Sequence, residues 1–226
     1  MNRIRLVVFD VAGTIIEDHG EVVSAFHAAL KKNGIPATEA ELAEWKGASK
    51  QEVIRHFVER EHRDNPQSRV DKAYSDFRNL LEDHYRGAVI PIAGAEQTFA
   101  WLRERDILIA TTTGFYREVN NLILEQTGWK RWFRASISSS DVKQGRPAPL
   151  MIFRAMEEAE VSAVSEVINV GDTPLDLQAG SNAGAAGVVG VLTGLHQEER
   201  LRREPHTHII GSVRDLPALI ERDFQT

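Results

Sequence analysis

Asp10 follows directly after an apolar run, 6–9, that predicts a buried β-strand. A buried carboxylate costs several kcal/mol unless a cation or hydrogen-bond donors meet it, so Asp10 requires a partner. In open α/β sheets, ligands bind at the carboxyl ends of the strands, which is where Asp10 is expected to lie. Taken by itself, the stretch is equally compatible with an acid that only caps the next turn.

Asp172 and Asp176 stand four residues apart, at the turn after another apolar run, 167–170. Carboxylate oxygens at such a turn suit a hard divalent cation such as Mg²⁺. The first turn of a helix also favours aspartate, and Asp176 could have only that capping role. Asp10 and Asp172, however, bring two anions to one edge of a sheet, where they repel each other unless a cation intervenes.

Two further polar groups follow predicted strands or turns. Thr113 and Gly114 end an apolar run, and a hydroxyl followed by backbone N–H groups near a helix start suits an anionic oxygen. Arg146 lies among glycine and proline residues that restrict its backbone. Each group alone could be ordinary, a strand threonine or a solvated arginine in a turn. Together with the acids they form a constellation for phosphoryl transfer, with a nucleophile, phosphate-binding groups and a metal site.

The elements expected around these residues alternate helix and strand from residue 87 onward, which is typical of a parallel sheet. Strands are predicted at 107–112, 135–138, 167–170, 187–192 and near 209, and helices at 95–104, 118–126, 150–158, 175–182 and 213–221. The first strand lies far upstream of its partners. The sequence therefore predicts an α/β Rossmann-like parallel sheet core, residues 1–15 and 87–226, with an inserted all-helical cap domain at 16–86.

Within the insert, apolar residues recur at helical spacing and no strand is predicted. The expected helices cover the residues around 22–30, then 39–45, a segment after the capping box at 49–52, and 70–84 beyond a polar break at 64–68. Such an insert would form a lid over the carboxyl edge of the sheet. Apolar residues on its first helix could also pair two copies of the chain in a homodimer.

Bulk composition narrows the class of protein. The 226 residues carry a formal net charge of −6, which argues against nucleic acid as the main partner. The chain has no cysteine, which excludes disulfides and thiolate chemistry and is consistent with a cytoplasmic location. No signal segment or membrane-spanning run is expected, so the predicted partner is a small molecule.

The chain resembles the haloacid dehalogenase superfamily, whose members use an aspartyl nucleophile. The four superfamily motifs have counterparts, in order, at 10–14 (Asp-Val-Ala-Gly-Thr), 113–114 (Thr-Gly), 146–149 (Arg-Pro-Ala-Pro) and 171–172 (Gly-Asp) with Asp176. The predicted insert has the position of a type-1 cap. The resemblance thus covers nearly the whole chain.

The resemblance implies a role for each matching residue. Asp10 would attack phosphorus and form an aspartyl-phosphate. Mg²⁺ would be held by Asp10, the backbone carbonyl of Ala12 and Asp172, with Asp176 in support through water or Arg146. The transferring phosphoryl group would be bound by Thr113, Gly114 and Arg146. Arg146 would also be a catalytic residue, because it would neutralise the charge of that group.

Ala12 is the position that separates the possible reactions. Phosphatases of this superfamily usually carry an aspartate there as general acid, and its absence slows departure of an alkoxide by roughly 10²–10⁴-fold. Ala12 together with Arg146 in a Gly-Arg-Pro-Xaa-Pro stretch is similar to the phosphonatase-like hydrolases. Those enzymes break a carbon–phosphorus bond after a cap lysine forms a Schiff base with an aldehyde, so that no acid is needed at the alanine position.

Lys50 is the candidate for the cap lysine that forms the Schiff base. In that role it would also bind the substrate. It is predicted at the first position of a helix, where the dipole disfavours a cation and helps to keep the amine neutral. Other interpretations are a solvated surface lysine or, as in β-phosphoglucomutase-like relatives, a cation that binds substrate phosphate, a role that Lys46 could share. The phosphonatases carry histidine where this chain has Val53 and tyrosine where it has Phe115.

The resemblance therefore implies a Mg²⁺-dependent phosphonatase-like hydrolase acting on phosphonoacetaldehyde or a related phosphonate. One alternative is a phosphatase of the same fold for a small phosphorylated metabolite, with Lys50 or Lys46 as the substrate clamp. A second alternative is a catalytically silent module that keeps only the phosphate pocket.

Overall fold

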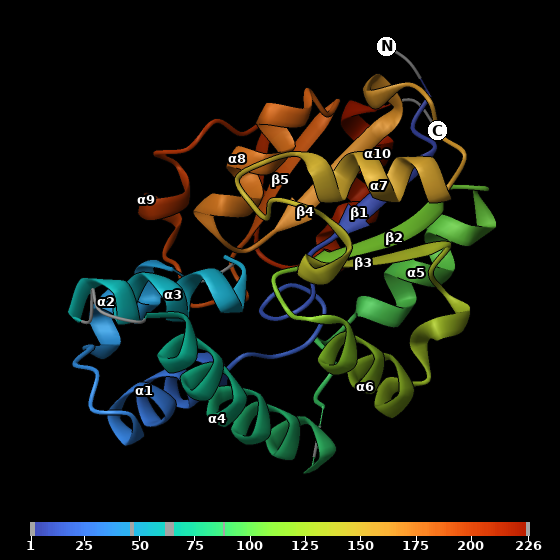
Figure 1. Ribbon diagram of the computed structural model, residues 1–226. Coiled ribbons are helices and arrows are strands. Elements are labelled where there is room, and N and C mark those ends of the chain that lie inside the picture. The colour runs from blue at the N-terminus through green and yellow to red at the C-terminus, as the bar shows by residue number, and fades with distance from the viewer. Residues whose placement is uncertain (1–2, 46–47, 62–65, 88, 225–226) are drawn as a thin grey trace.

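The computed structural model describes residues 3–45, 48–61, 66–87 and 89–224. Its centre is a parallel sheet with the strand order β3-β2-β1-β4-β5-β6 (Figure 1). The strands are β1 (Leu6–Phe9), β2 (Leu108–Thr113), β3 (Ala135–Ser138), β4 (Val167–Gly171), β5 (Gly187–Val191) and β6 (His208–Ile210). The predicted α/β class with a parallel Rossmann-like sheet is confirmed.

β1 explains why the sheet has two buried faces. Its side chains alternate, so that Leu6 and Val8 pack in one apolar cluster, while Val7 and Phe9 pack in another. Phe9 meets Phe99 with ring centroids 5.7 Å apart. A strand buried on both faces reads as a continuous apolar run, which is why the sequence predicted it correctly.

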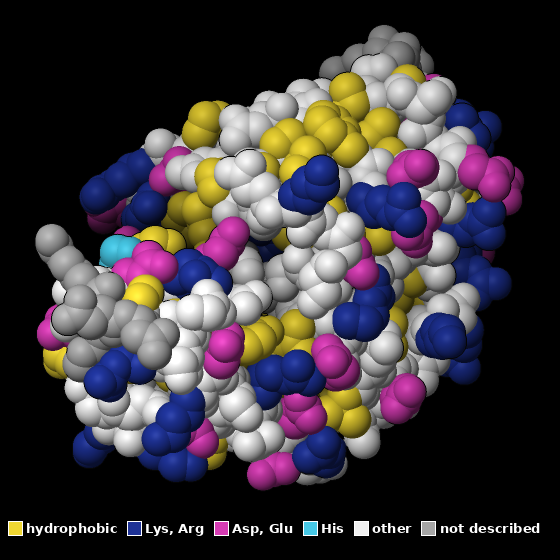
Figure 2. Space-filling view, in the orientation of Figure 1, with side chains coloured by type: hydrophobic (Ala, Val, Ile, Leu, Met, Phe, Trp, Pro, Cys, Tyr) yellow, Lys and Arg dark blue, Asp and Glu magenta, His cyan; other side chains and the backbone are white. Residues whose placement is uncertain are grey.

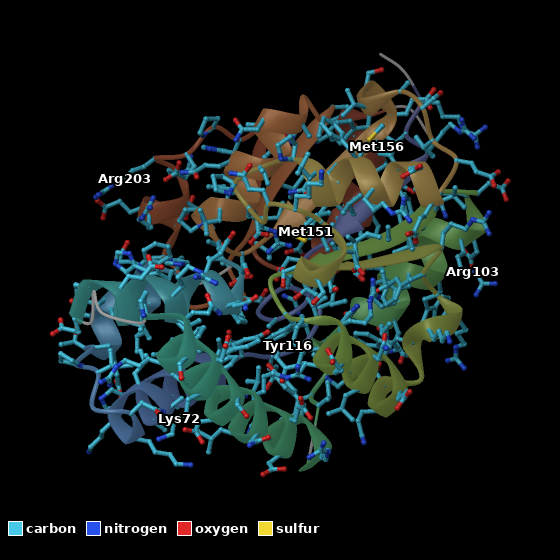
Figure 3. The ribbon with its side chains drawn as sticks, in the orientation of Figure 1. Lys72, Arg103, Tyr116, Met151, Met156 and Arg203 are labelled. Carbon is cyan, nitrogen blue, oxygen red and sulfur yellow. The ribbon has the colours of Figure 1, made fainter. Side chains whose placement is uncertain are left out.

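Helices cover both faces of the sheet. α7 (Leu150–Glu158) and α8 (Pro174–Ala183) pack on one face, where Met151 and Met156 join the cluster of Leu6 and Val8 (Figure 3). On the other face lie α5 (Ala95–Glu104), α6 (Arg117–Thr127) and α10 (Leu216–Asp223), and the short helix α9 (Glu198–Leu201) follows β5. Single 3₁₀ turns occur at Trp129–Arg131, Ser139–Asp141, Val164–Glu166 and Val213–Asp215.

The segment between β1 and α5 forms a separate helical block beside the sheet (Figure 1). Its helices are α1 (Glu21–Lys32), α2 (Glu39–Glu44), α3 (Lys50–Glu61) and α4 (Pro66–Gly87). The stacked rings of Phe26 and Phe77, 4.3 Å apart, hold α1 against α4. Thr38 and Glu41 form a reciprocal capping box that begins α2.

Two chain segments pass between this block and the sheet, and they lie side by side at this crossing. Glu17 N donates to Ile90 O at 2.8 Å, and Ile92 N donates to Ile15 O at 2.9 Å. A third link is Tyr116, which lies between α4 and α6 in Figure 3. Its hydroxyl donates to the Glu82 carboxylate at 2.9 Å.

Several predicted boundaries differ from the observed ones. α4 begins at Pro66, inside the polar break predicted at 64–68, because proline is well tolerated in the first turn of a helix. The helix predicted at 213–221 is a 3₁₀ turn followed by α10, and α9 was not predicted. The division into a core and a cap at 16–86 stays a prediction.

Side chains of both charges share the surface of the molecule. Basic and acidic side chains are interspersed on the described part of the face in Figure 2. Within the described residues, no helix has the length and apolar character needed to cross a bilayer.

Candidate active site

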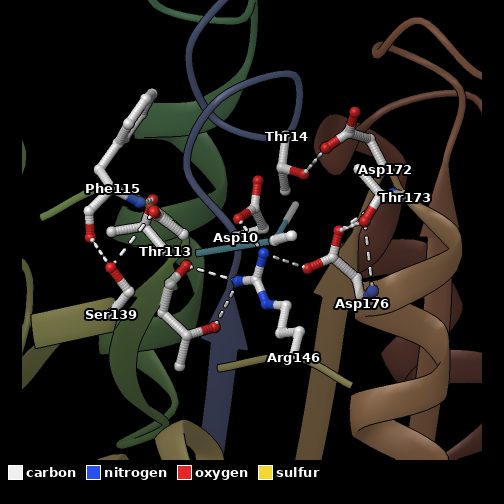
Figure 4. Close-up of polar contacts among 12 residues, drawn as sticks. Asp10, Thr14, Thr113, Phe115, Ser139, Arg146, Asp172, Thr173 and Asp176 are labelled. Carbon is white, nitrogen blue, oxygen red and sulfur yellow. Dashed lines mark hydrogen bonds and ion pairs between the residues drawn. The ribbon is translucent and has the colours of Figure 1, made fainter. Parts of the chain in front are cut away.

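Three carboxylates meet at the carboxyl edge of the sheet (Figure 4). Asp10 follows β1 and Asp172 follows the neighbouring strand β4, to which Asp10 is tied because its N–H donates to Val170 O at 2.8 Å. Asp176 lies in the first turn of α8. All three are buried, and one oxygen from each lies within 4.8 Å of the others. The sequence predicted this convergence.

α8 holds Asp176 in place through its N-terminal cap. The Thr173 hydroxyl donates to Asp176 Oδ2 at 2.5 Å, and Asp176 N donates to the Thr173 hydroxyl at 3.2 Å. Pro174 occupies the start of the helix. Asp176 thus has the capping role considered from the sequence through Oδ2, while its Oδ1 lies 2.6 Å from Arg146 Nη1; its role as a metal ligand stays a prediction.

Arg146 lies between two of the carboxylates. Its Nη1 is 2.7 Å from Asp10 Oδ1 and 2.6 Å from Asp176 Oδ1. Its Nη2 donates to the backbone carbonyl and the hydroxyl of Thr112, each at 2.8 Å. Burial opposes the positive charge, but the carboxylates raise the pKa of Arg146 above its ordinary value. The guanidinium is therefore a fixed internal cation. Its contact with Asp176 was one of two expected from the family resemblance, whereas its contacts with Asp10 and Thr112 were not predicted.

One guanidinium does not fully compensate three acids. Burial raises the pKa of Asp176 to about 7, and the carboxylates of Asp10 and Asp172 act in the same direction. Arg146 and the Thr173 hydroxyl lower it. Three convergent carboxylates of this kind fit a hard divalent cation, whose oxygen ligands would then all be ionised.

Two glycines let the backbone close around Asp172. Gly13 has φ near +90°, and a Cβ there would lie 2.5 Å from Asp172 Oδ2. A Cβ at Gly194, in the loop after β5, would lie 1.8 Å from the same oxygen. The Thr193 hydroxyl donates to Gly13 O at 2.6 Å and joins the two loops. Gly194 was missed because a glycine in a loop carries no chemical signal.

The predicted phosphate-binding loop follows β2. Thr113 Oγ1 accepts a hydrogen bond from Phe115 N at 3.1 Å. Ser139, at the end of β3, donates through its hydroxyl to Phe115 O at 2.9 Å and contacts Gly114 O at 3.3 Å. Ser139 was not predicted, although a hydroxyl directly after a strand is the same signal that identified Thr113.

A narrow cavity lies between the sheet edge and the helical block. It is lined by Asp10, Ala12, Asp18, Val22, Lys50, Thr113, Gly114, Phe115 and Thr173. Below we call Asp10, which lines the cavity, and the buried residues next to it, Arg146, Asp172 and Asp176, the charged floor. We call Asp18, Val22 and Lys50, which line the cavity from the segment between β1 and α5, the helical wall. The structure thus brings Lys50 to the predicted nucleophile, whereas Lys46 lies outside the described residues.

Lys50 is the first residue of α3 and is only 5% exposed. Its Nζ donates to Ala48 O at 3.3 Å and lies 5.1 Å from the centroid of the Phe115 ring. The interpretation of Lys50 as a solvated surface residue is therefore wrong. A buried amine over an aromatic face is a group from which the structure has largely excluded water.

The parallel sheet with a buried acid cluster at its carboxyl edge is the arrangement of an α/β protein with a candidate active site. The chain belongs to the haloacid dehalogenase-like hydrolase family, whose model matches residues 7–190. The resemblance predicted from the four motifs is confirmed, and so is the assignment as a hydrolase.

Named relatives include phosphonoacetaldehyde hydrolases. The enzyme of that name from Bacillus cereus is 31% identical over 207 residues, which cover 85% of this chain and 77% of that protein. A bifunctional phosphonoacetaldehyde hydrolase/aminoethylphosphonate transaminase from Clostridioides difficile is 31% identical over 215 residues. The match covers 87% of this chain but only 34% of that longer protein.

Solved structures show the same fold. A hydrolase from Pseudomonas syringae superposes with a TM-score of 0.87 at 18% identity, covering 98% of this chain and 100% of that one. A phosphonoacetaldehyde hydrolase like protein from Oleispira antarctica gives a TM-score of 0.83 at 24% identity, covering 97% and 92%.

Proposed function

We propose that this hydrolase cleaves the carbon–phosphorus bond of a phosphonate aldehyde, with phosphonoacetaldehyde as the first substrate to test. The observation that carries the proposal is the cavity itself. It holds a carboxylate, Asp10, and a buried amine, Lys50, and the position that would carry a general acid is Ala12.

The charged floor would bind Mg²⁺ through Asp10, Asp172 and Asp176, together with the backbone carbonyl of Ala12. The bound ion would supply positive charge for the phosphoryl oxygens and for the nucleophilic carboxylate. The buried acids support this role, since burial, together with the charges of Asp10 and Asp172, raises the pKa of Asp176, and a bound cation would favour its ionised form.

The phosphoryl group would be received by the loop after β2. Thr113 and Gly114 line the cavity opposite the helical wall, and their hydroxyl and N–H groups suit phosphoryl oxygens. Asp10 would attack phosphorus and become an aspartyl-phosphate. Arg146, 2.7 Å from Asp10, would hold that carboxylate and offset the charge that develops on phosphorus.

The leaving group explains the absence of an acid at Ala12. Condensation of the Lys50 amine with the aldehyde gives an iminium, which accepts the electron pair of the breaking carbon–phosphorus bond and becomes an enamine. An alkoxide would need a proton at the same point, whereas this leaving group does not.

Reductive trapping tests the proposal. Borohydride added with phosphonoacetaldehyde should inactivate the enzyme and attach the reduced two-carbon unit to Lys50, as read by peptide mass spectrometry. Absence of any adduct on Lys50, combined with steady hydrolysis of ordinary phosphate esters, would refute the imine mechanism.

A phosphatase acting on a small phosphorylated metabolite is the second candidate, and it is favoured by Val53. Val53 is fully buried and apolar at the position where the phosphonatases carry histidine. In that case Lys50 would bind the substrate as a cation and form no covalent bond. Lys46, also considered as such a clamp, lies outside the described residues.

The helices α1–α4 would act as a cap that closes over the substrate, with 16–86 as its extent. A homodimer through this cap stays a prediction.

A further inference from the structure

Asp18 is a second carboxylate in the cavity and belongs to none of the four family motifs. It is 7% exposed and forms the helical wall together with Val22 and Lys50. We propose that Asp18 carries the proton that Lys50 must release and return while it forms the imine. This inference rests on the proposed function and identifies a catalytic residue for it.

The backbone fixes Asp18 in this position. It is the first residue beyond the crossing at which Glu17 N donates to Ile90 O. Its Oδ1 accepts a hydrogen bond from Gly20 N at 2.9 Å, and Gly20 has φ near +96°, a conformation that favours glycine. The carboxylate is therefore held at the junction between the sheet and the helical block, on the cavity side.

The imine chemistry needs a proton carrier that the usual position does not supply. Val53 replaces the histidine of the phosphonatases, and the nearby His56 is exposed and packs on the Trp45 ring, with centroids 4.5 Å apart. Among the described residues that line the cavity there is no histidine. The ionisable side chains in that lining are Asp10, Asp18 and Lys50.

Asp10 and Tyr85 are poor substitutes for Asp18. Asp10 is paired with Arg146 at 2.7 Å and would be the nucleophile toward phosphorus. Tyr85, on α4, is buried, and burial raises its pKa well above the ordinary value, as do the charges of Asp18, Glu21 and Asp10. Tyr85 therefore stays protonated and cannot accept the proton from Lys50.

The proposed step balances with one proton and no added reagent. The Asp18 carboxylate takes a proton from the Lys50 ammonium, and the resulting amine attacks the aldehyde carbon. The carbinolamine forms when a proton moves from nitrogen to oxygen. Asp18 then returns its proton to the hydroxyl group, water leaves, and the nitrogen lone pair forms the iminium. The sum is ammonium plus aldehyde to iminium plus water, with Asp18 regenerated as a carboxylate.

The test compares initial rates of borohydride trapping at Lys50 in the full chain with phosphonoacetaldehyde. Asp18→Asn keeps an oxygen that can accept from Gly20 N but cannot carry a proton. We expect its trapping rate to fall roughly 10²-fold, the lower end of what general acid–base catalysis supplies. The half-saturating aldehyde concentration should stay within about 2-fold, because the phosphoryl-binding groups are untouched. Asp18→Glu should restore part of the rate.

Glu17→Gln is the matched control. Glu17 is the neighbouring carboxylate in sequence, pairs with His19 at 2.8 Å and does not line the cavity. Its trapping rate should equal that of the wild type. If Asp18→Asn does not fold, as judged by circular dichroism, Asp18→Ser repeats the comparison, since it also keeps an oxygen and lacks the carboxylate.

The outcomes separate this inference from the function on which it rests. Wild-type trapping with an unchanged rate in Asp18→Asn would overturn the role of Asp18 and leave the imine mechanism intact. A variant that loses affinity but keeps its rate would likewise overturn it. Absence of trapping in the wild type would overturn the proposed function, and the role of Asp18 with it.

Discussion

The charged floor and the helical wall come from different parts of the chain, the floor from the carboxyl edge of the sheet and the wall from the segment between β1 and α5. In the floor, Arg146 is bonded to Asp10 and Asp176 at 2.7 and 2.6 Å, so each charge is fixed by another. In the wall, Lys50 Nζ lies 5.1 Å from the centroid of the Phe115 ring and donates to Ala48 O at 3.3 Å. On the proposed function, the floor would serve phosphoryl transfer from many substrates, and the wall would determine which leaving group can depart.

Removing the nucleophile should have the largest effect. Asp10→Asn is expected to lower turnover of any substrate by roughly 10⁴–10⁶-fold, as for loss of other nucleophiles. Borohydride should still trap phosphonoacetaldehyde on Lys50, because the wall is unchanged. Loss of trapping together with turnover would show that floor and wall do not act separately.

Changing Lys50 should separate the two classes of substrate. Lys50→Ala is expected to lower cleavage of phosphonoacetaldehyde by at least about 10³-fold, since the carbon leaving group loses its electron acceptor. Hydrolysis of p-nitrophenyl phosphate, whose leaving group needs no acid, should change only a few-fold. Lys50→Arg is the matched control, because it keeps the charge and cannot form an imine. Full activity toward the aldehyde in Lys50→Arg would favour the clamp and contradict the imine.

Magnesium should stabilise the floor. At 100 times its Kd, Mg²⁺ is expected to raise the free energy of unfolding by about 2.7 kcal/mol, measured by urea denaturation with and without EDTA. The gain should be larger at pH 8 than at pH 5, because Asp176, with a pKa raised to about 7, must lose a proton before it can help to hold the ion.

The direction in which the stability of the metal-free protein changes with pH follows from the same raised pKa of Asp176. The unfolded chain releases this proton near pH 4 and the folded chain near pH 7, so the metal-free protein should lose stability as pH rises between these values. Asp172→Asn should remove most of the gain from Mg²⁺. An equal gain in that variant would place the ion elsewhere.

The smallest expected effect lies far from the floor, at the start of α2. Hydrogen bonds from the Thr38 backbone and hydroxyl, and then from Arg60, lower the pKa of Glu41 to about 2. Its contribution to stability is therefore present above about pH 4.5 and is lost as pH falls toward 2. Glu41→Gln should flatten this acid dependence in urea titrations and leave turnover unchanged. Altered turnover would show that α2 affects the wall.

The sequence predicted the floor better than the wall, for a physical reason. Asp10 and Asp172 follow buried strands, and a sheet brings such residues to one edge regardless of detail. Asp18 follows no apolar run and has no motif. It reaches the cavity only because two chain segments cross at Glu17 and Ile90, a tertiary feature that local patterns do not encode.

The contacts within the floor were predicted only in part. A contact between Arg146 and Asp176 was one of two expected from the resemblance, whereas the contacts of Arg146 with Asp10 and Thr112 depend on how the strands are placed. Most helices and strands were predicted from the periodicity of apolar residues. The start of α4 at Pro66 was not, because a proline in a polar stretch is typical both of a loop and of the first turn of a helix.

The crossing of 15–17 with 90–92 also sets an axis for motion. The chain enters the helical block through 15–17 and leaves it through 90–92, so a rotation about these two segments would leave the hydrogen bonds of the sheet intact. Asp18 adjoins the first of these segments, and Lys50 lies within the block at the start of α3. A rotation that moved Lys50 away from Asp10 would interrupt the proposed reaction, and only the closed enzyme would then be chemically competent.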